Sequence, residues 1–162
     1  FEFKTRPNTD CVVIDYKYFG RDDSPMSPYN KGRTTTHEVG HWLDLRHIWG
    51  DKKGSFGTDY VSDTSDQEEK TLGTASFPKT DHCIQVSPGV MFMNYMDYTD
   101  DACLNLFTKG QVERMLALFK SQNGIRKEML LYADALTAPT PPLHLWTHRC
   151  LQSECVHHQV FR

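Results

Sequence analysis

The spacing of three histidines around one glutamate constrains this chain more than any other feature of its sequence. The run consists of His37, Glu38, His41 and, further along, His47. Residues four apart on an α-helix lie about 40° apart around the axis and roughly 6 Å apart along it, so His37 and His41 share one face. Both imidazoles can therefore point at one metal ion, and Glu38 can reach a water on that ion without binding the metal. His47 is too far along the axis to join them from a straight helix, so the chain must turn sharply before it.

Asp44 is where we expect that turn. The long zinc-peptidase pattern H-E-x-x-H-x-x-G-x-x-H has glycine at this position, because the turn needs a positive φ angle. Aspartate is among the few other residues that tolerate such an angle, so Asp44 weakens the match without excluding the turn. A chance H-E-x-x-H on a solvated helix is the alternative, and the presence of His47 argues against it.

The size and charge of the chain exclude several classes of protein. Its 162 residues suffice for one ordinary domain, and 18 basic against 21 acidic residues give a net charge of −3. This balance indicates no surface for nucleic acid or an anionic membrane, and no apolar run of about 18 residues could form a transmembrane helix. The chain opens at Phe1 without an initiator methionine or a signal peptide, so we expect a mature fragment or a partial sequence.

A strand and a helix are predicted in the first third of the chain. Residues 11–19 are rich in β-branched and aromatic residues and end at Gly20, which is typical of a strand. This segment is either a simple core strand or an edge strand beside the metal that pairs with an extended peptide. The helix that carries the first histidines is predicted over residues 32–44.

A second helix and a tail are predicted towards the C-terminus. Thr108 and Gln111 form a capping-box pattern, and apolar residues follow at helical spacing until residues 123–124. Residues 125–136 could add a short helix. Residues 137–162 begin with a proline-rich linker and lack any periodicity, so we expect a disordered tail.

Two further features of the sequence leave alternatives open. Residues 51–71 are acidic and loop-like, which indicates either a solvated surface or a structural Ca²⁺ site. The five cysteines show no C-x-x-C spacing, and their odd number leaves at least one thiol unpaired. A second zinc site could form in the tail, although its spacing fits no familiar closed site; its ligands would be Cys150, Cys155, His157 and His158.

The chain resembles the pappalysin family of metzincin zinc peptidases from residue 11 to about residue 130. The motifs that carry the resemblance are residues 33–43, 45–51, 61–64, 91–98 and 107–111. The resemblance implies an α+β fold, with a metzincin-like catalytic domain over residues 1–136 and the tail beyond it. That domain would hold an edge strand, the active-site helix, a Met-turn, a C-terminal helix and much irregular loop. Family members have a longer upstream segment, so the sheet is expected to be incomplete.

The resemblance also implies roles for residues around the metal. These roles are three zinc ligands, a general base acting on the water that zinc activates, a hydroxyl that steadies the transition state, and the methionine of the Met-turn. The matching residues are His37, His41 and His47 for zinc, Glu38 as the base, Tyr98 for the hydroxyl and Met96 for the Met-turn.

A calcium site and a disulfide are implied less directly by the same resemblance. Asp59, Asp63 and Thr64 match the part of the family near which calcium binds. Related sequences carry two cysteines that this chain lacks, as partners for Cys83 and Cys103. These two could therefore pair with each other instead, provided that their Cα atoms lie within about 7 Å.

The implied function is that of a secreted zinc endopeptidase. It would act as a monomer on protein or peptide substrates, with Zn²⁺ as its cofactor and Ca²⁺ as a candidate second ion. One alternative is a metzincin remnant that binds zinc or peptide without turnover, because a small domain that lacks part of its sheet is marginally stable. Another is an interaction module stabilised by zinc in the tail at residues 137–162.

Overall fold

The computed structural model describes residues 9–21, 26–54, 57–121, 126–127 and 129. The chain divides into two compact units, of which the larger, residues 12–115, contains the histidine motif. The other unit combines residues 1–11 with residues 116–161. Within it, the guanidinium of Arg126 donates two hydrogen bonds to the carboxylate of Asp10, at 2.7 and 3.0 Å.

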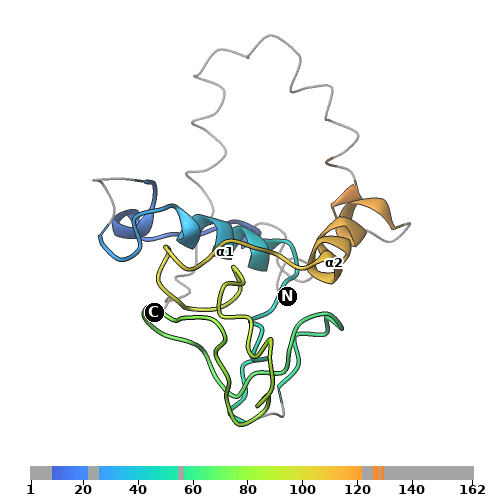
Figure 1. Cartoon of the computed structure of the whole chain (residues 1–162). Helices are drawn as coiled ribbons and strands as arrows, with labels where there is room; N and C mark the ends of the chain where they lie inside the picture. Colours follow the sequence, from blue (N-terminus) through green and yellow to red (C-terminus); the bar gives the residue numbers. More distant parts are fainter. Residues whose placement is uncertain (1–8, 22–25, 55–56, 122–125, 128, 130–162) are drawn as a thin grey trace. The chain divides into compact units, whose positions relative to one another are not determined.

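Helix α1 spans Arg33–Trp42 and carries the first two histidines of the motif (Figure 1). Gly32 precedes it with a φ angle of +75°, which glycine adopts at no steric cost. The buried carboxylate of Asp101 accepts hydrogen bonds from the backbone N–H groups of Lys31 and Arg33, at 2.9 and 3.1 Å. A carboxylate there satisfies N–H donors that have no partner in the helix. Its negative charge also interacts favourably with the positive, N-terminal end of the helix dipole. A residue from the second half of the chain therefore anchors the histidine helix.

Helix α2 spans Lys109–Lys120, and the capping box predicted at its start is confirmed. The N–H of Gln111 donates to the Thr108 hydroxyl at 3.1 Å, and the N–H of Thr108 donates to the Gln111 side-chain oxygen at 2.9 Å. Two N–H groups without partners are thus satisfied reciprocally. No helix in the described part of the chain combines the length and apolarity needed to cross a bilayer.

The strand predicted over residues 11–19 is wrong. Tyr16–Tyr18 form a single 3₁₀ turn, η3. The described residues form isolated β-bridges, and none of these extends into a ladder of several residue pairs. The carboxylate of Asp15 accepts a hydrogen bond from the N–H of Lys17 at 2.9 Å, which offers the backbone a local alternative to a ladder. The α+β class therefore holds only coarsely, as two helices with little strand.

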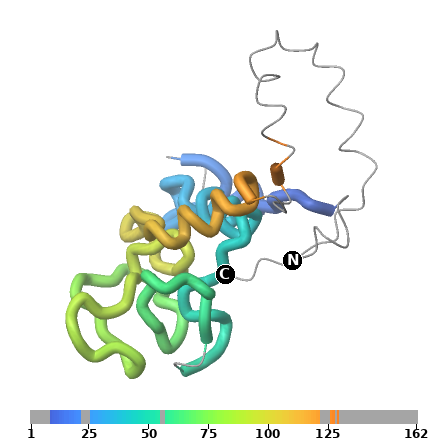
Figure 2. The backbone as a smooth tube through the Cα atoms, turned by 90° about the vertical axis from the view of Figure 1, so that its right-hand side faces the viewer, coloured from blue at the N-terminus to red at the C-terminus, as the bar shows by residue number. Residues whose placement is uncertain are grey.

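The core of the larger unit lies where α1 meets the segments that follow it. Leu45, Ile48, Trp49 and Met96 are buried against one another. Partly buried side chains pack around them: Met91, Tyr98, Phe107 and Met115. In Figures 1 and 2, α1 lies against the yellow part of the long irregular region, and the green part extends away from the helix.

Buried polar groups hold that irregular region together in place of a sheet. The carboxylate of Asp97 accepts hydrogen bonds from the Gln67 side chain and from the backbone N–H groups of Thr71 and Tyr98, at 2.8–2.9 Å. Burial raises the pKa of Asp97, and the three donors oppose that rise. The loop around residue 67 is thereby tied to the segment that follows Met96.

Several predictions fall on residues that the structure does not describe. The predicted end of the second helix at residues 123–124, most of the short helix at residues 125–136, and the tail at residues 137–162 lie outside the described residues. The division of the chain into residues 1–136 and 137–162 therefore stays a prediction.

Candidate metal centre

The turn between His41 and His47 forms as predicted. Asp44 has a φ angle of +68°, and its N–H donates to the carbonyl of His41 at 2.9 Å. One ring nitrogen from each of His37, His41 and His47 lies within 4.8 Å of the other two, which confirms their convergence. In the described part of the chain, no other group of three or more His, Cys, Asp or Glu side chains is placed to share a metal ion.

Each of the three imidazoles meets an oxygen acceptor at its Nδ1 atom. His37 Nδ1 lies 2.7 Å from the Tyr95 carbonyl, His41 Nδ1 lies 2.9 Å from the Leu45 carbonyl, and His47 Nδ1 contacts the Asp51 carboxylate. Because a carbonyl or an ionised carboxylate only accepts hydrogen bonds, Nδ1 carries the proton in each ring. The lone pair is then on Nε2, and such outer acceptors are what orient histidines that bind a metal.

The geometry of this cluster fits a zinc ion. Nε2 of His41 and Nε2 of His47 lie 3.0 Å apart with no hydrogen between them, so their lone pairs repel unless a cation lies near. Zinc bound tetrahedrally at about 2.0–2.1 Å from each nitrogen separates the nitrogens by about 3.3 Å. Burial, followed by the charge of His41, lowers the pKa of His47 to about 4. The His47 ring is therefore neutral at pH 7 and can donate its lone pair.

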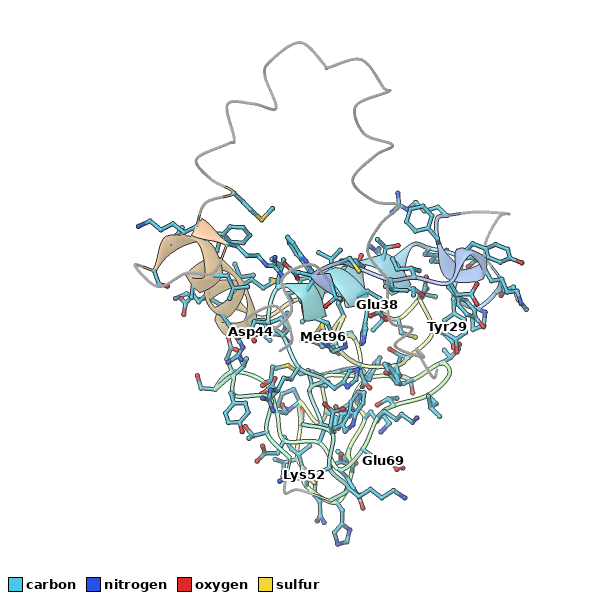
Figure 3. The ribbon with its side chains drawn as sticks, turned by 180° about the vertical axis from the view of Figure 1, so that it is seen from behind. Tyr29, Glu38, Asp44, Lys52, Glu69 and Met96 are labelled. Atoms are coloured by element: carbon cyan, nitrogen blue, oxygen red, sulfur yellow. The ribbon has the colours of Figure 1, made fainter. Side chains whose placement is uncertain are left out.

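Of the two residues with predicted catalytic roles, Tyr98 is the one with measured contacts to this cluster. The Tyr98 ring is centred 5.3 Å from the His37 ring and 4.9 Å from the His47 ring. Glu38 follows His37 directly on α1 and is half-buried (Figure 3). The ammonium of Lys70 lies 5.5 Å from the centre of the Tyr98 ring, which adds a positive charge at the edge of the site.

Two residues that support His47 were not predicted from the sequence. Trp49 stacks on the His47 ring, with centroids 4.2 Å apart and planes 8° apart, and it also meets Tyr98 edge-on at 5.0 Å. Asp51 holds Nδ1 of His47. The signal for Asp51 was its position four residues after a predicted ligand, and nothing in the sequence singled out Trp49.

Met96 lies directly beneath the histidine helix (Figure 3). It is fully buried, and the N–H of Met96 donates to the Asn94 side-chain oxygen at 2.9 Å. A Cβ atom at Gly40 would lie 2.6 Å from the Met96 sulfur, so any larger residue would force the buried Met96 side chain to move. The close contact explains why a glycine stands between His37 and His41 despite its low helix propensity.

The structure does not gather the candidate calcium ligands into one set. The Thr64 hydroxyl lies 2.8 and 3.0 Å from the two carboxylate oxygens of Asp59, whose pKa is raised by burial. Asp63 instead accepts hydrogen bonds from the Thr108 hydroxyl at 2.7 Å and from the Gly110 N–H at 2.8 Å. Those bonds hold the pKa of Asp63 below its usual range, the one from Gly110 most strongly, and they fix the start of α2.

The disulfide expected between Cys83 and Cys103 does not form. Both side chains are thiols in the structure, and the Cys103 sulfur lies 3.9 Å from the carbonyl oxygen of Ala75. The N–H of Cys83 donates to the Asp81 carboxylate at 2.8 Å. Local hydrogen bonds therefore fix the loops that carry the two thiols, in place of a covalent link.

Comparison with known proteins places these observations in a family. Residues 4–120 match the model of peptidase family M43, which is described as pregnancy-associated plasma protein-A. The matched stretch includes both helices, the histidine cluster and Met96. It covers well over half of the chain.

Relatives and solved structures point the same way. An extracellular metalloprotease of Arthroderma benhamiae is 44% identical over 116 residues, which is 69% of this chain and 41% of that protein. The solved structure of mature mirolysin from Tannerella forsythia, in complex with a cleaved peptide, superposes with a TM-score of 0.82 at 69% identity. That superposition covers 86% of this chain and 52% of mirolysin, so the chain spans about half the length of its solved relative.

The three lines of comparison agree with the resemblance seen in the sequence. The fold is similar to that of mirolysin over 86% of the chain, and the matched family is one of metallopeptidases. The chain belongs to the pappalysin family, peptidase family M43.

Proposed function

We propose that this chain is the zinc-binding part of a secreted endopeptidase that cleaves extended protein or peptide substrates. The observation that carries the proposal is the convergence of three histidines whose Nδ1 atoms are all held by oxygen acceptors. The relatives named extracellular metalloproteases and the mirolysin structure with its cleaved peptide support it.

The residues around the cluster divide the chemistry among them. His37, His41 and His47 would hold zinc, which when bound polarises a carbonyl and lowers the pKa of water. Glu38 would accept the proton of the attacking water and pass it to the leaving amine. The Tyr98 hydroxyl would donate a hydrogen bond to the developing oxyanion, and one such donor is typically worth about 3 kcal/mol.

Metal removal tests this function. We expect purified protein to bind one zinc ion per chain and to cleave casein, an unfolded protein substrate. Treatment with a chelator should abolish cleavage, and added zinc should restore it, because the histidines alone supply no Lewis acid. Cleavage that continues at full rate after the zinc has been removed would contradict the proposal.

A second candidate function is the binding of zinc or peptide without turnover. The observation that favours it is the missing strand at residues 11–19, because an extended substrate gains backbone hydrogen bonds from such an edge. The same experiment separates the two functions. Stoichiometric zinc without cleavage of casein would favour the second.

We also propose that Asp59 and Thr64, with Asp63 nearby in the sequence, bind calcium. The Thr64 hydroxyl lies within 3.0 Å of both Asp59 oxygens and 2.8 Å from the Val61 carbonyl, although it has one proton to donate. Such a convergence of oxygens suits a hard cation.

Thermal unfolding tests the calcium proposal. Saturating Ca²⁺ at about 100 times its Kd should raise the Tm by roughly 5–10 °C relative to chelated protein. Asp59→Asn should lose this shift, and Asp66→Asn, an exposed neighbour in the same loop, should keep it. An unchanged Tm in wild-type protein would remove the calcium site.

A further inference from the structure

An arginine from helix α2 forms a hydrogen bond and an ion pair with the turn that leads to the third histidine. Arg114 donates from Nε to the backbone carbonyl of Asp44 at 2.7 Å, and its Nη2 lies 2.8 Å from the Asp44 carboxylate. Both side chains are about three-quarters buried, with exposed fractions of 25% and 23%. One planar guanidinium thus fixes the peptide and the side chain of a single residue, and charge assists both contacts.

Asp44 is the residue at which such contacts matter most. It has a φ angle of +68°, where a side chain is sterically unfavourable and where the wider zinc-peptidase pattern has glycine. It lies between His41 and His47, so its backbone angles decide whether His47 reaches the other two. The two contacts from Arg114 therefore offset the conformational free-energy cost of the positive φ angle at Asp44, which the metal cluster needs.

Buried hydrogen bonds fix the position of helix α2, from which Arg114 makes this contact. Gln111, one turn before Arg114, forms a reciprocal pair of hydrogen bonds with the Asn94 side-chain amide, at 2.8 and 3.1 Å. Both amides are fully buried, and the Asn94 oxygen also accepts the N–H of Met96. Residues three apart share a helix face, so one face of α2 holds the segment beneath the metal through Gln111 and the Asp44 turn through Arg114.

We propose that Arg114 is a positioning residue that sets the zinc affinity of the cluster by holding the Asp44 turn. The inference rests on the proposed zinc function. Arg114 is not a ligand and would act on the cluster through Asp44, whose position on the α2 side of α1 is seen in Figure 3. The simpler interpretation is a surface ion pair, which would have little effect.

The matched comparison is between Arg114→Met and Lys109→Met. Each removes one positive charge from α2, but the side chain of Lys109 is 87% exposed and pairs with Glu113, which is also exposed. We expect Arg114→Met to weaken zinc binding about 10–100-fold, as loss of residues that orient ligands typically does. Lys109→Met should bind zinc with the wild-type Kd. Arg114→Lys should be intermediate, because one ammonium cannot match the fork of the guanidinium.

Two further readouts separate positioning from general stability. The visible spectrum of the Co²⁺-substituted protein should shift in Arg114→Met and stay unchanged in Lys109→Met, while the Tm of the metal-free protein changes little in either. In an Asp44→Gly background, the same Arg114→Met change should weaken zinc binding several-fold less, since glycine adopts the turn unaided.

Wild-type zinc affinity and an unchanged cobalt spectrum in Arg114→Met would overturn the inference. So would a loss of metal-free stability that accounts for the whole loss of zinc affinity. Because the readout is metal binding, a wild-type protein that binds zinc but cleaves nothing would contradict the peptidase function and leave this inference standing. A wild-type protein that binds no zinc would overturn both.

Discussion

Glu38→Gln is expected to remove nearly all peptide hydrolysis and to leave the zinc content unchanged. Glutamine keeps the size and the position of the side chain on α1 but cannot accept the proton of the attacking water. General acid–base groups typically contribute about 10²–10⁴-fold to the rate, so kcat/KM should fall by at least that range. Turnover of a quenched fluorescent peptide and the zinc content per chain measure the two effects.

The control for this change is Glu113→Gln, which removes the same charge from an exposed side chain on α2. That variant should hydrolyse the peptide at the wild-type rate. If Glu38→Gln is equally active, Glu38 is not the base. If Glu38→Gln loses zinc together with activity, Glu38 contributes to metal binding and its role as the general base is not supported.

Gly57→Ala is expected to destabilise the fold and to weaken zinc binding together. A Cβ atom at Gly57 would lie 2.0 Å from the backbone oxygen of Trp49 and 3.0 Å from the Cα atom of Gly50. Neither is the end of a flexible side chain, so the two backbone segments must separate. Overpacking of this kind costs about 1–3 kcal/mol. Because Trp49 stacks on His47, its displacement also disturbs a metal ligand.

Urea unfolding and a zinc titration measure these two effects. Gly73→Ala is the control: its φ angle is +70°, but no atom beyond its two chain neighbours lies within 4 Å of the added Cβ. It should cost about 1–2 kcal/mol from backbone conformation alone and should bind zinc normally. A Gly57→Ala variant that keeps wild-type zinc affinity would show that the two segments can separate without moving His47.

The metal cluster was predictable because local rules determine it. Helical periodicity places His37 and His41 together, and the distance to His47 demands a turn at a residue that tolerates positive φ. The structure has that turn at Asp44. The capping box of α2 followed in the same way from two residues three apart.

The parts that escaped prediction depend on partners far apart in the sequence. The apolar pattern of residues 11–19 indicated a strand, but a strand needs a neighbouring edge, and the Asp15 side chain offered the backbone a nearer partner. Arg114 lies 70 positions from Asp44, and Asp63 lies 45 from Thr108. No local pattern reveals such pairs, so the contact of Asp63 with the start of α2 was not predicted.

The oxygen acceptors behind the three imidazoles differ in how far mutation can alter them. The carbonyls of Tyr95 and Leu45 belong to the main chain, so every amino acid at those positions supplies the same acceptor. The acceptor behind His47 is the carboxylate of Asp51, a side chain that is 57% exposed. A single replacement at position 51 can therefore change the basicity of the His47 imidazole, whereas no replacement at position 45 or 95 removes the acceptor behind the other two histidines. Among the three acceptors, only the one at position 51 can be changed by mutation to alter how tightly the metal is held.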